Sequence, residues 1–440
     1  MIAIYQRCEQ KIPLCARGEL PARTCVSAGM PLVVLCLIVA VLAFAPLARG
    51  EKSSSAAADP GQLNALFGLP LWAAGGGFWD QSVDELLLRL PVRLESGAGR
   101  DGGGAAGQGV YSAYTRGMPA LGAQLMQLSI ATADGRLRQI DMVFANKGDS
   151  VESRERDFRS HFRQTRKAVA GALRGAFGLP QRGRVPIAGK AQMADYWQIA
   201  DAIVVMDDER NEFIIVRIVP GGAAAAAVPS ARELKKQVRD TDFSQRVRRE
   251  ANGDVYIAGI PMVNQGDKGY CAPSTIERCF RYYGVQGIDM HRIAEESGTA
   301  FGGGTAVRDM INAMRPYFRR YGLRLDATAL KFRQLQREIN AGYPMLWTLY
   351  ASDEFLMRMQ GNSLARQRQA FQDWVKVLRK QKVLPGRRSG AHICLIIGYN
   401  AESNEIAISN SWGPGYEIHW VSMRDAEAVT QDRSVYVVRP

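Results

Sequence analysis

The chain has 440 residues, of which 47% are hydrophobic and 22% are charged, and its formal net charge is +13. This length exceeds what one hydrophobic core usually organises, so we expect two folded domains. The Lys and Arg residues are scattered through helical stretches instead of forming one block with interleaved aromatic residues, which favours a solvated surface over nucleic-acid binding.

An uncharged apolar run covers residues 30–48 and follows a basic stretch that contains Arg17 and Arg23. The run is long for the core of a signal peptide and just long enough to span a bilayer, so a cleaved signal and a retained membrane anchor both stay open. Translation that starts at Met30 would account for the long stretch before it. We predict an exported protein, periplasmic, extracellular or membrane-anchored, in which residues 1–58 form a targeting region with a flexible Ser/Ala tether.

Residues 59–220 are predicted to form a small α+β domain. A hairpin pattern surrounds Asp134-Gly135, helical spacing follows over residues 150–177, and two further β-rich runs end near residue 220. The predicted order is strand-strand-helix-strand-strand, with no cluster of residues suited to chemistry. The Gly-rich stretch 97–109 lacks the Gly-Lys-Ser/Thr ending of a phosphate loop and is predicted to be a plain loop.

The composition of residues 221–250 predicts an Ala-rich linker followed by a charged helix. Residues 251–440 begin helix-rich and end in strands, which predicts a second α+β domain with helices first and an antiparallel sheet afterwards. A helical insertion rich in Arg, Gln and Met interrupts the strands at residues 353–380 and is a candidate lid or partner surface.

Cys271 stands at the start of a predicted helix, with Gln265 six positions before it and Pro273 in the first helical turn. The positive end of a helix dipole favours a thiolate, which is the reactive form of a cysteine. The Cys271 backbone N–H and the Gln265 side-chain amide are predicted to form an oxyanion hole. The alternative for Cys271 alone is a small buried residue near a turn.

His392 opens the apolar strand AHICLIIGYN, and Asn410 follows the next strand in ISNSWGPGY. From there the Asn410 amide is expected to hold the imidazole in the orientation that proton transfer needs. Trp412 is expected to shield this hydrogen bond from water. Taken alone, His392 could be a core histidine and the NSWG segment could be a plain turn. The occurrence of Gln, Cys, His and Asn together in this order favours catalysis.

Together these residues resemble the papain-like cysteine peptidases. The likeness rests on the six-residue spacing of Gln265 and Cys271, on GAHICLIIGY around His392 and on NSWG from Asn410 to Gly413. It implies a helical lobe that carries the nucleophile and a following antiparallel β lobe. It also implies roles: Cys271 as nucleophile, His392 as general base and acid, Asn410 as orienting residue and Gln265 as oxyanion donor.

The residues KGYCA around Cys271 lack the neighbouring cysteine and the following aromatic residue of the papain signature. CAPST followed by RYYG is more similar to the bacterial peptidases that remove double-glycine leaders from bacteriocins, although those usually carry Asp where this chain has Asn410. We therefore predict a divergent bacterial peptidase between the two groups. It would cleave a peptide or protein substrate without a metal or an organic cofactor. The resemblance does not predict its substrate specificity.

Two other functions stay open on the same residues. Acyl transfer to an amine, in crosslinking or amidation, uses the same Cys, His and Asn, and an inactive peptidase fold would leave binding to the domain at residues 59–220. That domain is expected to recognise substrate or a partner, or to mask the cleft until the basic stretch 246–249 is cut. The sequence does not predict the oligomeric state.

Smaller features complete the sequence predictions. Trp412 and the backbone of Gly303 and Gly304 are candidate substrate-binding elements. Cys279 and Cys394 could form a disulfide or could simply be buried, and unpaired burial is slightly favoured. No Cys/His spacing typical of a structural zinc site occurs.

Overall fold

The computed structural model describes residues 59–440 except 76, 97–107, 134, 150–153, 188–189, 222–229 and 286. The targeting region, most of the Gly-rich stretch and most of the Ala-rich linker lie outside these residues. From Ala57 onward the chain forms one compact unit. The domain boundaries at residues 220 and 251 stay a prediction.

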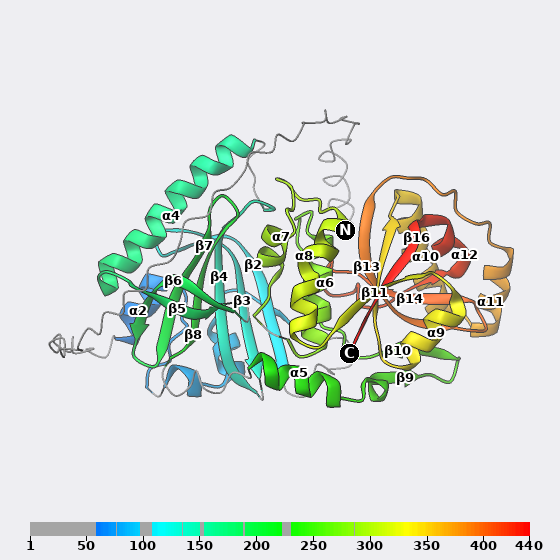
Figure 1. The fold of residues 1–440 in the computed structure, drawn as a ribbon, viewed down its shortest axis with the longest axis horizontal. Helices are drawn as coiled ribbons and strands as arrows, with labels where there is room; N and C mark the ends of the chain where they lie inside the picture. The colour runs from blue at the N-terminus through cyan, green and yellow to red at the C-terminus, as the bar shows by residue number, and fades with distance from the viewer. Residues whose placement is uncertain are drawn as a thin grey trace, which may run out of the picture. The chain divides into compact units, whose positions relative to one another are not determined.

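An eight-stranded antiparallel sheet, here called the N-terminal sheet, occupies the first half of this unit (Figure 1). Its strand order is β1-β2-β3-β4-β8-β7-β6-β5. The strands are β1 (Glu95–Ser96), β2 (Gln108–Ala120), β3 (Ala123–Ala133), β4 (Arg136–Asn146), β5 (Gln181–Ile187), β6 (Lys190–Ile199), β7 (Ala202–Glu209) and β8 (Phe213–Pro220).

Helices accompany the N-terminal sheet. In the part of the chain that the structure describes, the short helices α2 (Pro60–Phe67), η1 (Phe78–Asp80) and α3 (Val83–Arg89) precede it. The long helix α4 (Glu155–Phe177) crosses the sheet and buries apolar residues at helical spacing, including Phe158, Phe162 and Leu173, against it (Figure 1). The predicted helix is confirmed, but four strands precede it and four follow it, more than the predicted order contains. Among the additional strands, β2 and β5 are rich in Gly and polar residues and show little alternation.

A second antiparallel sheet, here called the C-terminal sheet, follows after α5 (Ala231–Asp240) and η3 (Phe243–Arg246). Its main path is β11-β16-β12-β13-β10-β9, and β14 pairs with β13 and β15. The strands are β9 (Val247–Arg249), β10 (Asp254–Ile257), β11 (Arg324–Ala329), β12 (Met345–Tyr350), β13 (Ala391–Asn400), β14 (Glu405–Ser409), β15 (His419–Ser422) and β16 (Thr430–Arg439).

The helices of this half come mainly before the main strands. They are α6 (Cys271–Tyr282), α7 (Met290–Glu296), α8 (Val307–Arg320) and α9 (Phe332–Asn340), followed by α10 (Asp353–Arg368), α11 (Phe371–Lys380) and α12 (Met423–Val429). The pair α10 and α11 confirms the helical insertion. Among the described residues, no helix is both long and apolar enough to cross a membrane.

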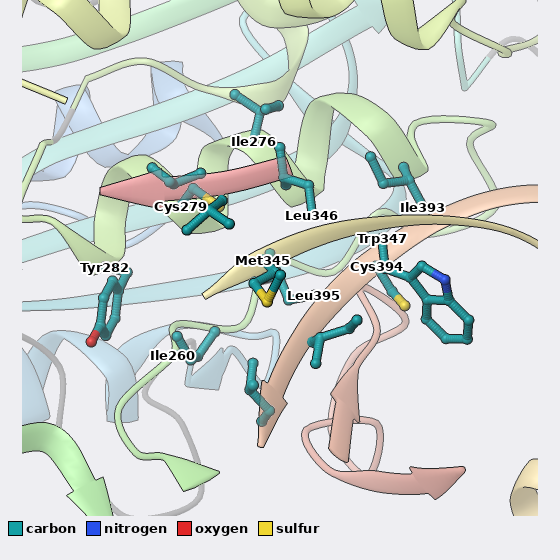
Figure 2. Close-up of a cluster of buried hydrophobic side chains, with 14 of the residues drawn as sticks. Ile260, Ile276, Cys279, Tyr282, Met345, Leu346, Trp347, Ile393, Cys394 and Leu395 are labelled. Carbon is teal, nitrogen blue, oxygen red and sulfur yellow. The ribbon is translucent and has the colours of Figure 1, made fainter. Parts of the chain in front are cut away.

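The core of this half joins helix α6 to the sheet. Figure 2 shows Ile276 and Cys279 of α6 among the apolar side chains of β12 and β13. Cys279 and Cys394 are both buried free cysteines, which confirms the expectation that they do not pair. Because α6 is held against β13 by this core, its first residue is fixed close to the beginning of that strand.

Candidate active site

Cys271 is the first residue of helix α6, as the sequence predicts, and Tyr270 is its N-cap. Backbone N–H groups of Ile393, Ala272 and Cys271 itself donate hydrogen bonds to the Cys271 sulfur. Since Ile393 directly follows His392 in β13, the sulfur lies beside the segment that carries the imidazole. Thr275 on the next turn of α6 also donates to the Ile393 carbonyl, at 3.3 Å between Oγ1 and O.

Burial raises the pKa of the Cys271 thiol above its ordinary value, and the three N–H donors lower it by less. This differs from the thiolate-favouring setting expected from the sequence. The dipole at the start of α6 is present, but removal of water from the sulfur disfavours the charged form more strongly. The resting side chain, which keeps partial exposure, is therefore a neutral thiol at neutral pH.

His392 and Asn410 come together because β13 and β14 are neighbours in the sheet. Leu395 of β13 pairs with Ser409 of β14, so the start of one strand lies beside the end of the other. There the Nε2 atom of His392 lies 2.9 Å from Oδ1 of Asn410. An amide oxygen only accepts hydrogen bonds, so Nε2 carries the proton and Nδ1 keeps its lone pair.

Trp412 stacks on the His392 ring with centroids 4.6 Å apart and planes 25° from parallel. Burial lowers the pKa of His392 to about 4, although the hydrogen bond that His392 donates to Asn410 opposes this shift. A neutral imidazole thus stands close to a neutral thiol in the resting protein. If Cys271 were to act as a nucleophile, its proton would therefore have to be transferred during attack, since no ion pair exists beforehand.

Gln265 lies at the end of an irregular stretch and is buried. Its backbone N–H donates to the carbonyl of Ser411 at 2.9 Å, and its side-chain Nε2 donates to the carbonyl of Lys268 at 2.9 Å. If the Gln265 amide were flipped, its oxygen would face the Lys268 carbonyl oxygen, and two acceptors would be in contact. The orientation with Nε2 toward Lys268 is therefore the stable one. A primary amide has two N–H donors, and Lys268 takes one of them.

Two contacts that the sequence analysis missed hold the Asn410 segment. Met359 of α10 accepts a hydrogen bond from Asn410 Nδ2 at its sulfur, at 3.8 Å. Arg278 of α6 is fully buried and donates to the carbonyl of Ser409 at 3.2 Å and to the hydroxyl of Ser411 at 3.4 Å. Both contacts join residues far apart in the chain, so no local sequence pattern indicates them.

The backbone of Gly303 and Gly304 is engaged within the protein. The N–H of Gly304 donates to the carbonyl of Gly269 at 3.0 Å, and that of Gly303 donates to Ala300 at 3.0 Å. A Cβ atom on Gly303 would lie only 2.3 Å from Gly269 Cα, so the loop needs glycine for close packing beside the segment that precedes Cys271. These donors are therefore not free to hold an extended substrate.

The remaining histidines of this half are packed. His291 in α7 is buried and lies beside Asp289, and His419 in β15 stacks on Tyr416 with ring centroids 5.4 Å apart. Within the described ranges, no group of three or more His, Cys, Asp or Glu side chains is placed to hold a metal ion.

Comparison with known proteins adds the family. Residues 257–432 match the model of the Peptidase_C39 like family. This part of the chain is similar to that family. No curated protein matches the chain.

The Peptidase_C39 like match begins shortly before Gln265 and includes Cys271, His392 and Asn410. It confirms the resemblance to a divergent papain-like or C39-type cysteine peptidase, and it supports a hydrolase that acts on peptides or proteins. The N-terminal sheet lies outside the match.

Proposed function

We propose that the protein is an exported cysteine peptidase that cleaves amide bonds through a thioester on Cys271. One observation carries the proposal: His392 is held by Asn410 on its Nε2 side, while the N–H of the very next residue donates to the Cys271 sulfur. This arrangement, where the start of α6 faces the start of β13, supports Cys271 as the nucleophile and His392 as its base. The family match supports the same reaction class.

The proposed reaction proceeds in two halves. The Cys271 sulfur attacks the substrate carbonyl carbon as its proton passes to His392 Nδ1, and the new oxyanion accepts hydrogen bonds from the Cys271 N–H and from Gln265 Nε2. The carbon–nitrogen bond then breaks as His392 gives its proton to the leaving amine. Water attacks the thioester, His392 takes a proton from it, and the acid leaves as the sulfur regains its proton.

Asn410 and Trp412 serve this chemistry indirectly. The Asn410 oxygen fixes the tautomer in which Nδ1 is the basic nitrogen. The stacked indole of Trp412 covers one face of the imidazole and limits the ways in which the ring can rotate. His392 can then shuttle the proton between sulfur, leaving amine and water without reorientation.

The test is intact-mass labelling at pH 7.5 with an epoxysuccinyl thiol-peptidase inhibitor. We expect one adduct in the wild type, none in Cys271→Ala and strongly slowed labelling in His392→Ala. Cys279→Ala is the matched control because Cys279 lies on the same helix but is fully buried, and it should keep the adduct. A folded wild type that takes no adduct, or labels equally fast without His392, would overturn the proposal.

The export part of the proposal rests on the apolar run at residues 30–48, which lies outside the described residues. Expression in a bacterium with separation of cytoplasm, membrane and periplasm tests it. Mature protein whose N-terminus lies after residue 48 would show cleavage, and full-length protein in the membrane fraction would show anchoring. Full-length protein in the cytoplasm would contradict export.

A further inference from the structure

The loop that joins the oxyanion donor to the nucleophile, here called the nucleophile loop (residues 264–270), is held by the N-terminal sheet. Lys268, at the middle of this loop, has a fully buried side chain. Its Nζ lies 2.7 Å from Asp149 Oδ2 and 2.9 Å from Gln127 Oε1, and it stands 4.7 Å above the ring of Tyr114. All three partners belong to the N-terminal half of the compact unit.

The turn after β4, here called the β4 turn (residues 146–149), makes a second contact with the loop. Tyr270 donates from its hydroxyl to Asn146 Oδ1 at 2.8 Å, and Asn146 Nδ2 donates to Asp149 Oδ2 at 3.2 Å. Lys268, Asp149, Asn146 and Tyr270 therefore form one connected polar network. Tyr270 immediately precedes Cys271, so the network reaches the residue next to the nucleophile.

Close packing makes this contact specific in shape as well as in charge. A Cβ atom on Gly148 in the β4 turn would lie 2.4 Å from the Tyr270 ring. A Cβ atom on Gly266 in the nucleophile loop would lie 2.4 Å from the Tyr114 ring. The β4 turn thus has a glycine facing Tyr270, and the nucleophile loop has a glycine facing Tyr114. A larger side chain at either glycine would push the loop away from the N-terminal half.

The same network reaches the oxyanion donor through the backbone. Gln265 Nε2 donates to the carbonyl of Lys268, the residue whose ammonium group Asp149 holds. The loop has no regular secondary structure and contains glycine at positions 266 and 269, so its conformation is not set locally. A buried ammonium group needs its anionic partner, and loss of that partner would favour a loop in which Lys268 reaches water.

We infer that the N-terminal sheet is a permanent part of the peptidase site and that Lys268, clamped by Asp149, is a positioning residue for Gln265 and Cys271. The inference rests on the proposed function and deepens it. The β4 turn fixes the side chain of Lys268, the Lys268 carbonyl orients the Gln265 amide, and Tyr270 fixes the start of α6. The N-terminal half is then required for turnover, in contrast to a masking segment whose removal would activate the enzyme.

The experiment compares Asp149→Asn and Tyr270→Phe with the wild type in the full chain. Glu405→Gln is the matched control because it also removes a carboxylate charge from a buried ion pair, with Arg366, but does not contact the nucleophile loop. Three quantities are measured: turnover of the activated ester N-benzyloxycarbonyl-glycine p-nitrophenyl ester, the rate of Cys271 alkylation by iodoacetamide, and hydrogen exchange of residues 264–270. Alkylation forms no oxyanion, so it separates access to the thiol from stabilisation of the transition state.

We expect Asp149→Asn to lower kcat at least about tenfold, because small misplacements of catalytic groups cost up to about 10²-fold. Its KM and its alkylation rate should stay within about threefold, and exchange in the nucleophile loop should increase. Tyr270→Phe keeps the aromatic packing and should show a smaller effect of the same kind, which covers the case in which Asp149→Asn does not fold. Glu405→Gln should lose stability but keep kcat and the exchange pattern of the loop.

Two results would overturn the inference. One is wild-type kcat and loop exchange in both Asp149→Asn and Tyr270→Phe. The other is an equal loss of kcat in Glu405→Gln at a similar loss of stability, which would show a general effect of destabilisation. If the wild type lacks His392-dependent labelling, the proposed function fails, while the exchange measurement still decides whether Asp149 holds the loop.

Discussion

His392 lies face to face with Trp412, with ring centroids 4.6 Å apart, while its Nε2 atom is hydrogen-bonded to Asn410. The two contacts restrict different motions of the imidazole. Stacking on the Trp412 indole restricts tilting of the imidazole ring. The hydrogen bond to Asn410 restricts rotation of the ring about the bond that joins it to the rest of the side chain. The Nδ1 atom is therefore held in one direction, which is the preorganisation that the proposed proton transfer requires.

Removal of the Asn410 amide should lower turnover more than substrate binding. In Asn410→Ala the Nε2 proton loses its acceptor, so both tautomers become accessible and the base is misdirected for part of the time. We expect kcat for ester hydrolysis to fall roughly 10- to 100-fold, within the contribution that positioned proton transfer makes to catalysis. KM should change little, because Asn410 is buried and does not line the surface.

The matched control for Asn410 is Met359→Leu. This change keeps the volume beside Asn410 and removes only the sulfur contact to Nδ2. Such sulfur contacts are weak, so kcat should fall less than about threefold. Equal losses in the two variants would mean that packing of α10, and not the hydrogen bond to His392, sets the activity.

The alkylation of Cys271 should show the pH dependence of a neutral thiol. Burial raises the pKa of Cys271 and lowers that of His392 to about 4, so between these values neither group is charged. The thiolate fraction then increases with pH, and the rate of labelling by iodoacetamide should rise about tenfold per pH unit from pH 6 to 8. A plateau of fast labelling at pH 5–6 would instead reveal a preformed thiolate–imidazolium pair.

The start of α6 at Cys271, the strand that carries His392 and the strand before Asn410 were all predictable from the sequence. Each depends on a local pattern: Pro in a first turn followed by apolar helical spacing, or a continuous apolar run of a buried strand. The resemblance then supplied the chain order of the site residues. The structure brings the starts of α6 and β13 together through packing of α6 on the sheet.

What the sequence could not show depends on burial or on distant partners. Whether Cys271 is a thiol or a thiolate depends on how much water the fold removes, and the helix dipole alone gave the wrong direction. No local pattern indicates the role of Lys268, because its partner Asp149 lies more than one hundred residues away in the turn after β4. Strand β5 was missed because its Gly, Pro and Arg residues resemble those of a loop.

The depressed pKa of His392 also predicts how stability depends on pH. In the unfolded chain this imidazole titrates near its ordinary value of about 6.5, whereas in the folded protein the pKa is about 4. Above pH 6.5 both states are neutral and the group adds no pH dependence. Between pH 6.5 and 4 the unfolded state binds a proton that the folded state excludes, so the free energy of unfolding falls as pH falls, by at most about 3 kcal/mol.

Urea unfolding at pH 7 and pH 4.5 measures this effect. The difference between the two pH values should be smaller in His392→Gln than in the wild type, because glutamine does not titrate. Because each protein is compared with itself at the two pH values, any change in the free energy of unfolding that the substitution causes equally at both pH values cancels. If both proteins lose equal stability between pH 7 and 4.5, His392 is not protected from protonation by the fold.

Arg278 should be the residue of α6 whose loss damages both the fold and the site. Its guanidinium donates to the carbonyl of Pro261 at 2.7 Å and to Ser409 and Ser411 on either side of Asn410. Burial lowers the pKa of Arg278 to about 10, so its guanidinium stays charged at neutral pH. Three buried acceptors therefore depend on one side chain.

Arg278→Met should lower the free energy of unfolding by more than about 2 kcal/mol, because each buried acceptor left unpaired costs about 1–3 kcal/mol. Arg278→Lys keeps the charge but not the planar fork, so it should be intermediate. Arg319→Met, the same change at an exposed position on α8, should stay within about 0.5 kcal/mol of the wild type. Because the lost hydrogen bonds flank Asn410, kcat of the folded Arg278→Lys protein should also fall, and wild-type turnover in that variant would show that Asn410 is held without Arg278.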